Sequence, residues 1–375
     1  MRGKRLLIVI DFFPEIKGGA EKQVFLLASR LAKGAFANVD ILVLQSGCLI
    51  QDILRENDIG LFVEKISRVY SPNGFLAAWE WKERIISRGY NAVMSYHFGA
   101  DLWVSFIASE LRKRNIKVVS NRRDSGFWMR PSHRLLYGIA INRLFDECVY
   151  VSKSALKQWP GGCRNCVVIP NAIDLNEFNP LPENFREGLR EQIGVPGDAV
   201  MLLYTASLFP LKNHALIIRA MPYLLDRGLS IKVVFAGYDR GGKDGLLSLA
   251  RSLAVDKDIL FLGERRDIPE LIGASDICVQ ASFSEGMSNT LLEYMAGQRP
   301  VIASDIPANR EAAGDCALFV NPKDIKGFAK AVEFLINSEE EKNSIVRRAY
   351  ERVREKFSIE AMTEAYFNIL FKNEI

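Results

Sequence analysis

The sequence predicts an α/β protein built from two doubly wound, Rossmann-like domains. Short apolar runs alternate with helical patterns along both halves of the chain, as expected for βαβ units in a parallel sheet. The chain has 375 residues, more than one hydrophobic core usually holds. Between the halves, residues 174–185 (DLNEFNPLPENF) carry two prolines and little periodicity, which is typical of a linker.

The elements follow in order from the hydrophobic pattern. In the first half, apolar runs predict strands at residues 5–11, 39–45, 92–96, 117–121 and 148–152. After the first strand, residues 20–33 predict an amphipathic helix whose apolar face is Val24, Leu27, Ala28 and Leu31. In the second half, strands are predicted at residues 200–206, 231–236, 259–262, 277–281, 301–303 and 317–320.

The most informative segment is 282–305, SFSEGMSNTLLEYMAGQRPVIASD, which places Glu285 and Glu293 eight residues apart around a helix start. Residues 282–286 read as the turn after a buried strand, and residues 287–296 are good or neutral helix formers. Gly297 is expected to form a left-handed C-terminal cap, and Pro300 prevents the helix from continuing.

This strand-turn-helix unit suits a nucleotide diphosphate joined to a sugar. The first helical turn leaves backbone N–H groups of residues 286–289 without internal partners, and the helix dipole favours phosphate there. A carboxylate repels phosphate, so Glu285 is expected to accept hydrogen bonds from sugar hydroxyls, and Glu293 to do the same for a ribose. The alternative is that Glu285 only stabilises the helix dipole and that Glu293 is a solvated surface acid.

The string EGMSNTLLEYMAGQRPVIASD resembles the E-x7-E signature of the retaining nucleotide-sugar glycosyltransferases called group 1 or family 4. Other segments resemble further landmarks of that family, in the family's order. They are GGAE at 18–21, VIPNAID at 168–174, ASLFPLKN at 206–213, FAGYD at 235–239 and FLGERRDIPELIGASD at 261–276. The resemblance spans nearly the whole chain and is more specific in the C-terminal half.

The resemblance implies the GT-B fold, in which ligands bind at the carboxyl ends of the strands in a cleft between two domains. Residues 1–176 are then the acceptor-binding domain and residues 177–357 the nucleotide-sugar-binding domain. Residues 358–375 form a C-terminal segment whose helix, expected at 358–371, crosses back to the first domain.

The resemblance also assigns roles at the donor site. Lys212 is expected to neutralise the leaving diphosphate, although a surface lysine is the simpler interpretation. The family has an arginine where this chain has Ser207, so one cation is missing from the expected site. Arg265 or Arg266 is expected to replace that charge or to lie by the base, and the alternative is that either faces solvent. The full set of expected nucleotide-sugar contacts is Gly18, Gly19, Ser207, Lys212, Gly237, Arg265, Arg266, Glu285, Gly286, Met287, Ser288, Asn289, Thr290 and Glu293. The two N-terminal glycines permit close backbone approach to a ligand or simply form a tight turn.

The N-terminal catalytic position departs from the family. Many members carry a histidine after the fourth strand, near the reacting carbon, and the corresponding stretch here is expected to be VVSNRRDSGF at 118–127, which has no histidine. Some relatives have an S-E-R-N-D type sequence there, which SNRRD resembles, so Arg122, Arg123 and Asp124 are candidates for substrate contacts. His97, at the end of a predicted strand, is a second candidate, although a histidine in that place is more often structural. The predicted catalytic set is Glu285, Lys212, Arg123, Asp124 and His97.

Charge and aromatic residues differ between the halves. Lys plus Arg against Asp plus Glu is 25 against 17 for residues 1–180 and 24 against 28 for residues 181–375, or +8 and −4. All five tryptophans lie in the basic half. This combination fits an anionic membrane surface, whereas the alternative is a solvated face with core tryptophans. We expect peripheral contact with the inner face of the cell membrane and no nucleic-acid partner.

The remaining composition favours a cytoplasmic chain. No run approaches a membrane span, and the N-terminus enters a buried strand without a cleavage site. The six cysteines lie mostly in apolar contexts, as in a reducing compartment, and Cys163 and Cys166 form a lone CxxC that is expected to be structural or incidental rather than a zinc site.

Three functions are compatible with these observations. The first is a retaining, metal-independent transferase that moves a hexose or N-acetylhexosamine from a UDP- or GDP-sugar, with UDP favoured, to a glycan or lipid-linked acceptor in cell-surface polysaccharide synthesis. The second is a nucleotide-sugar 2-epimerase of the same fold, and the third is a catalytically weak subunit that binds nucleotide sugar. No DxD motif stands out, and no cofactor beyond the donor substrate is expected.

Overall fold

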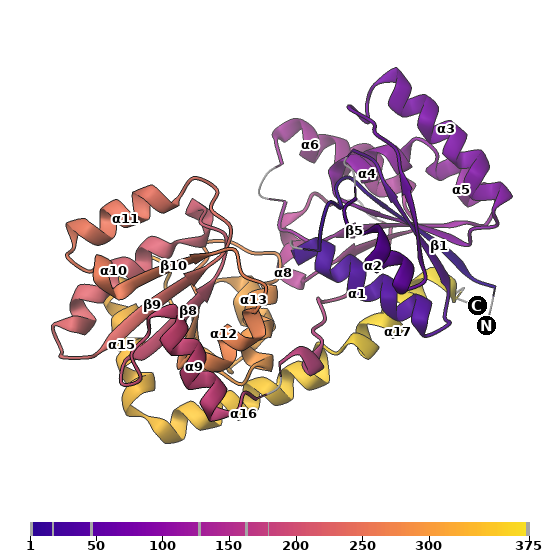
Figure 1. Ribbon diagram of the computed structural model, residues 1–375. Helices are drawn as coiled ribbons and strands as arrows, with labels where there is room; N and C mark the ends of the chain where they lie inside the picture. The colour runs from indigo at the N-terminus through magenta and orange to yellow at the C-terminus, as the bar shows by residue number, and fades with distance from the viewer. Residues whose placement is uncertain are drawn as a thin grey trace. The chain divides into compact units, whose positions relative to one another are not determined.

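The computed structural model describes residues 3–16, 19–45, 48–126, 129–161, 164–178 and 180–372. The chain divides into two units, residues 1–172 with 359–375 (unit 1) and residues 173–358 (unit 2). Each unit contains one parallel sheet with helices packed on it (Figure 1). The unit boundaries at 172/173 and 358/359 lie near the domain boundaries expected from the sequence.

Unit 1 contains a seven-stranded parallel sheet in the order β3-β2-β1-β4-β5-β6-β7. Its strands are β1 (Arg5–Ile10), β2 (Asn38–Val43), β3 (Ile59–Val63), β4 (Ala92–Tyr96), β5 (Lys117–Arg122), β6 (Glu147–Tyr150) and β7 (Cys166–Val168). The chain builds outward from β1 to β3 and then returns to the other side of β1, so the strand order switches between β1 and β4. In doubly wound sheets, ligands bind at the carboxyl ends of the strands beside this switch point.

Helices cover both faces of this sheet because the strand residues alternate between two cores. Leu6, Ile8 and Ile10 pack toward α1 (Gly19–Lys33) and α17 (Ile359–Phe371). Leu7 and Val9 pack toward α3 (Pro72–Ser87), α4 (Phe98–Ser105) and α5 (Ala108–Lys113). The remaining helical segments of unit 1 are α2 (Gln51–Glu56), α6 (Pro131–Leu136), the π-helical turn η1 (Tyr137–Ile141), α7 (Asn142–Leu144) and α8 (Lys153–Gln158).

The last helix, α17, packs in unit 1 and is fixed there by polar contacts as well as by apolar ones. The Tyr366 hydroxyl accepts hydrogen bonds from Asn121 Nδ2 (2.6 Å) and Arg123 Nη1 (3.0 Å). On the α1 side, the rings of Phe36 and Phe367 lie 5.8 Å apart. The chain therefore ends on the same sheet on which it begins.

Unit 2 contains a six-stranded parallel sheet in the order β10-β9-β8-β11-β12-β13, with its switch point between β8 and β11. Its strands are β8 (Val200–Thr205), β9 (Ile231–Ala236), β10 (Ile259–Gly263), β11 (Ile277–Gln280), β12 (Val301–Ser304) and β13 (Leu318–Val320). Its helices are α9 (Glu183–Ile193), α10 (His214–Leu225), α11 (Lys243–Ser252), α12 (Ile268–Ala274), α13 (Asn289–Ala296), α14 (Pro307–Ala313), α15 (Ile325–Asn337) and α16 (Glu339–Lys356). Three short 3-10 turns, η2 (Leu175–Glu177), η3 (Pro210–Lys212) and η4 (Asp256–Asp258), connect them.

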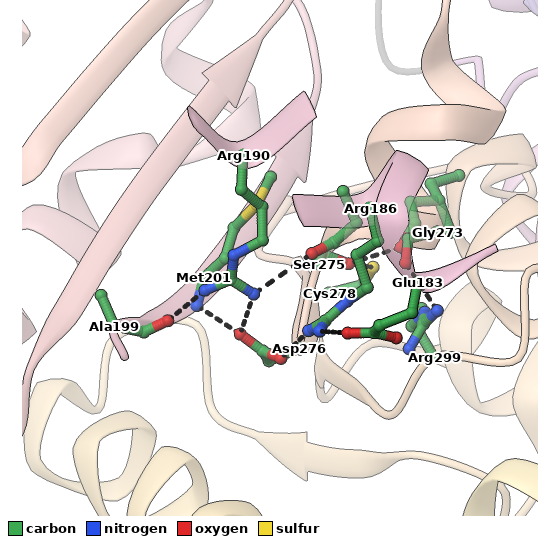
Figure 2. A network of polar contacts seen from close by, with 12 residues as sticks. Glu183, Arg186, Arg190, Ala199, Met201, Gly273, Ser275, Asp276, Cys278 and Arg299 are labelled. Atoms are coloured by element: carbon green, nitrogen blue, oxygen red, sulfur yellow. Dashed lines mark hydrogen bonds and ion pairs between the residues drawn. The ribbon is translucent and has the colours of Figure 1, made fainter. Parts of the chain in front are cut away.

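At the amino edge of this sheet, α9 is fixed by ion pairs to Asp276, directly before β11 (Figure 2). Arg186 Nη2 lies 2.6 Å from Asp276 Oδ1, and Arg190 Nη1 lies 3.0 Å from Oδ2. The same Oδ2 accepts a hydrogen bond from the Met201 N–H at 2.7 Å. Since the carboxylate is fully engaged by the scaffold, we assign this network to structure rather than to ligand binding.

Helix α13 differs from the sequence prediction at both ends. It begins at Asn289 instead of residue 287, because the Ser288 side chain caps it by accepting from Leu291 N. At the other end, Gly297 has a φ of −74° and is not a left-handed cap, so that prediction is wrong. The left-handed residue is Gln298, with a φ of 54°. Gly297 is needed for another reason: a Cβ there would lie 2.4 Å from Ile272 Cγ2.

The structure shows the state of five cysteines and allows a search for membrane-spanning helices and metal sites among the described residues. Cys48, Cys148, Cys278 and Cys316 are free and buried. Cys166 is disulfide-bonded, and Cys163 lies outside the described residues. Among the described segments, no helix is long and apolar enough to cross a membrane, and no cluster of three or more His, Cys, Asp or Glu side chains is arranged to hold a metal ion.

Candidate functional site

The candidate site of unit 2 lies where β8 and β11 end, at the switch point of its sheet. Lys212 follows β8 in the turn η3, and Glu285 follows β11 in the loop before α13. Lys212 Nζ and Glu285 Oε1 are 2.5 Å apart, and their side chains are 28% and 13% exposed. Two residues expected from the sequence to act on one ligand are therefore brought together, and they form an ion pair with each other.

Four hydrogen bonds hold the two loops that carry this pair. The Phe283 N–H donates to the Leu211 carbonyl at 2.9 Å, and the Tyr204 hydroxyl donates to the Lys212 carbonyl at 2.8 Å. Asn213, with a φ of 56°, donates from Nδ2 to the carbonyls of Ala281 (3.3 Å) and Pro322 (2.8 Å). Lys212 thus provides a side chain for the site, whereas the next residue, Asn213, holds the loop in place.

A buried polar network supports Glu285 from beneath. Gln280 Nε2 donates to Glu285 Oε1 at 3.1 Å, and Gln280 Oε1 accepts from Asn309 Nδ2 at 2.7 Å. Ser304 Oγ lies between them, 2.6 Å from the Ser282 carbonyl. This network was not predicted from the sequence. Its only signal was polar residues at the ends of apolar strands, namely Gln280 after β11 residues ICV and Ser304 after VIA.

The start of α13 is joined to the end of β8. The Tyr294 hydroxyl accepts from Thr205 N at 2.7 Å, and Thr290 Oγ1 donates to the Thr205 carbonyl at 3.3 Å. Gly286, Met287 and Ser288 are buried, whereas Asn289 and Thr290 are half-buried. The predicted contacts therefore line the start of one helix, but the Ser288 and Thr290 hydroxyls already have structural partners.

Glu293 lies within α13 and is only 6% exposed. The alternative interpretation of a solvated surface acid is therefore wrong for this residue. Carboxylates are seldom buried without a partner, and Glu293 is engaged in the present structure. Its ribose-binding role is a prediction.

The other donor-site candidates surround the ends of β8, β9 and β10. A Cβ on Gly237 would lie 2.1 Å from the Ala206 carbonyl oxygen, so this glycine permits close approach of the loop that holds Ser207. Arg265 forms a two-bond pair with Asp267, at 2.8 Å and 2.5 Å, which lowers the pKa of that carboxyl. Arg266 is exposed. Arg265 is thus already paired, which disfavours it as a replacement for the missing family arginine.

In unit 1, the structure contradicts the substrate-contact role of Arg122. Its side chain is 2% exposed and donates to Tyr150 Oη (2.5 Å), Asn142 Oδ1 (2.7 Å) and Ser120 Oγ (3.2 Å). It stacks over Trp159, 4.6 Å from the ring centroid, and lies 3.9 Å from Asp101 Oδ2. Arg122 is a buried scaffold cation that no substrate reaches.

Arg123 and Asp124 lie half-buried after β5. Arg123 donates to the Tyr366 hydroxyl of α17 and to Asn171 Oδ1, and Asp124 Oδ1 accepts from Gly126 N at 2.6 Å. The Trp159 indole N–H donates to the Asp124 carbonyl at 2.9 Å. Arg123 therefore joins the sheet to α17 and to the end of unit 1, which favours a positioning role over direct catalysis.

His97 follows β4 and begins the turn into α4, with φ and ψ of 74° and 165°. The prediction that no histidine follows the fourth strand is therefore wrong, because the unpredicted β3 makes residues 117–122 the fifth strand. Burial lowers the pKa of the His97 imidazole to about 4, so it is neutral at pH 7. Asp11 follows β1 and is 6% exposed, and its Oδ2 accepts from Gly99 N at 2.9 Å. Burial raises the pKa of Asp11 to about 7. Asp11 was not singled out from the sequence, where it reads as the polar end of an apolar strand.

The glycine pair before α1 is described in part. Gly19 is the first residue of α1, after the end of β1 and so on the switch-point side of the sheet. Gly18 lies outside the described residues.

Comparisons with known proteins agree with this geometry. Residues 185–352 match the model of the family Glycosyl transferases group 1. EpsD of Bacillus subtilis strain 168, whose name describes a glycosyltransferase, is 29% identical over 226 residues, 59% of this chain and 58% of EpsD. The UDP-Gal:alpha-D-GlcNAc-diphosphoundecaprenol alpha-1,3-galactosyltransferase of Escherichia coli is 32% identical over 38% of this chain and 37% of its own length. These two matches span 58% and 37% of the relatives' own lengths.

Two solved structures resemble the whole chain. A glycosyltransferase from Rickettsia africae superposes with a TM-score of 0.85 at 20% identity, covering 99% of this chain and 100% of that one. Anabaena Alr3699/HepE, in complex with UDP and glucose, superposes with a TM-score of 0.84 at 18% identity, covering 98% and 99%. Together with the two strand orders, this likeness confirms the predicted GT-B fold.

Proposed function

Through residues 185–352 this chain belongs to the Glycosyl transferases group 1 family, and on that premise we propose that it is a retaining, metal-independent hexosyltransferase. Its donor is a UDP-sugar, with a GDP-sugar as the alternative. Its acceptor is a hydroxyl of a glycan or lipid-linked glycan in cell-surface polysaccharide synthesis. The observation that carries the proposal is the Lys212–Glu285 pair at the switch point of unit 2.

The proposed reaction breaks the bond between the anomeric carbon and the phosphate oxygen and forms a bond from the acceptor oxygen to the same carbon, on the same face. The proton of the acceptor hydroxyl passes to the departing phosphate oxygen. The Lys212 ammonium stabilises the charge that develops on the diphosphate, and Glu285 accepts hydrogen bonds from the sugar hydroxyls. The protein mainly positions two substrates, and no metal or cofactor takes part.

The UDP donor is supported by a related structure and by the site itself. Anabaena Alr3699/HepE, of the same fold, was solved with UDP and glucose. In this chain, buried Glu293 lies within α13, eight residues after Glu285 in the preceding loop, as expected for a group that accepts from ribose hydroxyls. The choice of UDP over GDP belongs to the proposal and depends on side chains around the base.

For the acceptor side, we propose peripheral contact of unit 1 with an anionic membrane. Four large apolar side chains on and before α3 are exposed, namely Tyr70 (69%), Phe75 (44%), Leu76 (59%) and Trp79 (37%). Lys82 Nζ lies 3.9 Å from the Trp79 ring centroid, so a cation accompanies the apolar group. Exposed aromatics beside cations suit a lipid interface. Binding to anionic vesicles that weakens in Leu76→Glu, and that neutral vesicles do not support, is the expected result.

A second candidate is a catalytically weak subunit that binds nucleotide sugar. Ser207 stands where the family has an arginine, and the described Arg265 is already paired with Asp267, so the diphosphate site has fewer free cations than the family pattern. The 2-epimerase alternative is disfavoured by the combination of the E-x7-E and GGAE segments.

An assay of UDP release separates these candidates. The purified chain is incubated with UDP-sugars and with lipid-linked glycan acceptors, and UDP release that requires the acceptor indicates transfer. Retention is tested by the anomeric configuration of the product in its NMR spectrum. Binding of UDP-sugar without UDP release would favour the subunit, and conversion of the free nucleotide sugar would favour the epimerase.

A further inference from the structure

A pocket in unit 1 lies at the amino ends of β5, β6 and β7, on the opposite edge of the sheet from its switch point. Each of the three strands contributes its first residue to the lining, namely Lys117, Glu147 and Cys166. The end of α17 forms another wall through Asn368 and Lys372. The pocket encloses about 480 Å³, a volume that suits a small molecule. The proposed transfer reaction gives this pocket no task.

A buried carboxylate in this pocket has hydrogen-bond partners on one oxygen only. Glu147 is 7% exposed, and both of its partners use Oε1: Lys117 Nζ lies at 3.2 Å and Asn165 Nδ2 at 3.4 Å. The other oxygen, Oε2, is buried without a hydrogen-bond partner. Leaving a buried carboxylate oxygen unpaired costs stability, and a ligand that donates to this oxygen would remove that cost.

A second unpartnered acceptor comes from a different element of the same pocket. Asn368, near the end of α17, has its Oδ1 buried without a hydrogen-bond partner. Since a carboxylate or amide oxygen accepts only from N–H or O–H groups, both Glu147 Oε2 and Asn368 Oδ1 call for donors on a ligand. The hydroxyls of a sugar or another polyol are donors of this kind.

Cations dominate the charge of the pocket. Lys117, Arg164 and Lys372 line it, against the single carboxylate of Glu147. Lys117 is already paired with that carboxylate. Arg164 and Lys372 are exposed, and within the described ranges neither side chain forms an ion pair. A guanidinium and an ammonium that are both available at one pocket favour an anion, and phosphate is the anion that such pairs commonly bind.

We propose that this pocket is a second ligand site of the chain and that it binds a phosphorylated polyol, such as a sugar phosphate. The phosphate pairs with Arg164 and Lys372, and the hydroxyls donate to Glu147 Oε2 and Asn368 Oδ1. A purely structural role accounts for the Lys117–Glu147 pair but leaves the two buried oxygens without partners. The site is separate from both switch points, and it does not depend on the proposed transfer reaction.

The test is calorimetric titration of the full chain with glucose 6-phosphate, glucose and inorganic phosphate. We expect glucose 6-phosphate to bind at least about 10-fold more tightly than either of the others, because each of those satisfies only one half of the pocket. Vesicles that contain phosphatidylinositol test whether the same chemistry reaches the pocket as a lipid headgroup. Co-sedimentation that weakens in Lys372→Ala would identify that source, whereas binding of glucose 6-phosphate alone identifies a free ligand.

Variants separate ligand binding from folding. Arg164→Ala and Lys372→Ala are each expected to weaken glucose 6-phosphate binding about 10-fold, with little change in melting temperature because both side chains are exposed. Asn368→Leu removes an acceptor that has no partner in the protein, so it is expected to weaken binding about 3- to 10-fold without lowering the melting temperature. The matched control is Lys65→Ala, which removes an exposed cation after β3, at the other edge of the same sheet. It is expected to change neither quantity.

Three results would overturn the inference. The first is no binding of glucose 6-phosphate or of the vesicles at millimolar ligand. The second is equal affinity in the wild type, Arg164→Ala and Lys372→Ala. The third is binding that disappears in Lys212→Ala, which would locate the ligand at the candidate site of unit 2. Because the titration contains no nucleotide sugar and no acceptor, its result is independent of whether the proposed transfer function holds.

Discussion

The two switch points of this chain hold their polar groups in opposite ways. In unit 2, Lys212 and Glu285 neutralise each other at 2.5 Å, and Gln280 donates a further hydrogen bond to the carboxylate. In unit 1, Asp11 keeps an unpartnered buried oxygen beside a strained His97. In unit 2, Lys212 and Glu285 are therefore paired without a ligand, whereas in unit 1 the Asp11 Oδ1 atom is buried without a hydrogen-bond partner.

The ion pair in unit 2 suggests how the proposed donor is handled. A diphosphate that binds Lys212 gains charge stabilisation but competes with Glu285, while a sugar hydroxyl gives the same carboxylate new donors. The pair is thus suited to a ligand that offers an anion and hydroxyls together, as a nucleotide sugar does.

The largest expected effect is a loss of stability, and it tests whether Arg122 in unit 1 is a structural residue rather than a substrate contact. Arg122→Met leaves Asp101 buried without its cation, and it is expected to lower the free energy of unfolding by about 3–5 kcal/mol. Arg112→Met is the matched control, because the Arg112–Asp146 pair at 2.7 Å is partly exposed and is expected to contribute only about 1 kcal/mol or less. Urea unfolding measures both. Equal losses would mean that Arg122 is not the buried anchor described here.

The next effect tests the pair in unit 2. Lys212→Ala and Glu285→Ala are each expected to lower kcat about 10²- to 10³-fold, as for loss of a charge-stabilising group. The double variant is expected to lose much less than the product of the two, since the residues act as a unit. Lys232→Ala is the control, because its ion pair with Asp258 at 2.7 Å lies at the amino edge of the same sheet. Full activity in both single variants would refute the site assignment.

A pH experiment tests the unsatisfied carboxyl of unit 1. Burial raises the pKa of Asp11 from 3.8 to about 7, so the folded state holds a proton that the unfolded state has lost, and stability falls as pH rises across that window. Asp11→Asn removes this dependence. Relative to wild type, the variant is expected to gain about 2 kcal/mol of stability between pH 5 and pH 7. The lowered pKa of His97 makes stability rise with pH, but His97 is present in both proteins, so its contribution cancels in their difference. An equal difference in unfolding free energy between wild type and Asp11→Asn at pH 5 and pH 7 would contradict the prediction.

The smallest effect concerns the network beneath Glu285. Gln280→Leu removes an acceptor that both Asn309 and Ser304 use, and it is expected to cost about 1–2 kcal/mol of stability. It also frees Glu285 to move, so KM for the donor is expected to rise more than kcat falls. Unchanged donor KM would show that Glu285 does not depend on this support.

Much of the fold could be predicted because burial on both faces makes each central strand an apolar run. The predicted strands at 92–96 and 231–236 coincide with β4 and β9, and the other predicted strands differ by one or two residues at their ends. β3 and β7 were not predicted. β3 contains Gly60 and is mostly half-buried at the sheet edge, and β7 has only three residues.

The site was predictable only in part. Lys212 and Glu285 lie in loops beside strand ends, where a local pattern is visible, and the structure brings them together. Arg122 was misassigned because its partners, such as Asp101 and Trp159, are distant in sequence. The prediction of a left-handed cap at Gly297 was wrong for the same reason. A glycine is required there because a side chain would collide with Ile272, not because of the backbone angle of residue 297.

The most direct test of the central claim is the melting temperature of the chain with and without UDP, GDP, ADP and their sugar conjugates. A ligand at about 100 times its Kd stabilises the folded state by ~2.7 kcal/mol, which corresponds to roughly 5–10 °C for a domain of this size. We predict such a shift with a UDP-sugar in the wild type and in Lys232→Ala, and a much smaller one in Lys212→Ala and Glu293→Ala. No shift with any nucleotide at millimolar concentration, or an equal shift in all four proteins, would contradict a nucleotide-sugar site at the switch point of unit 2.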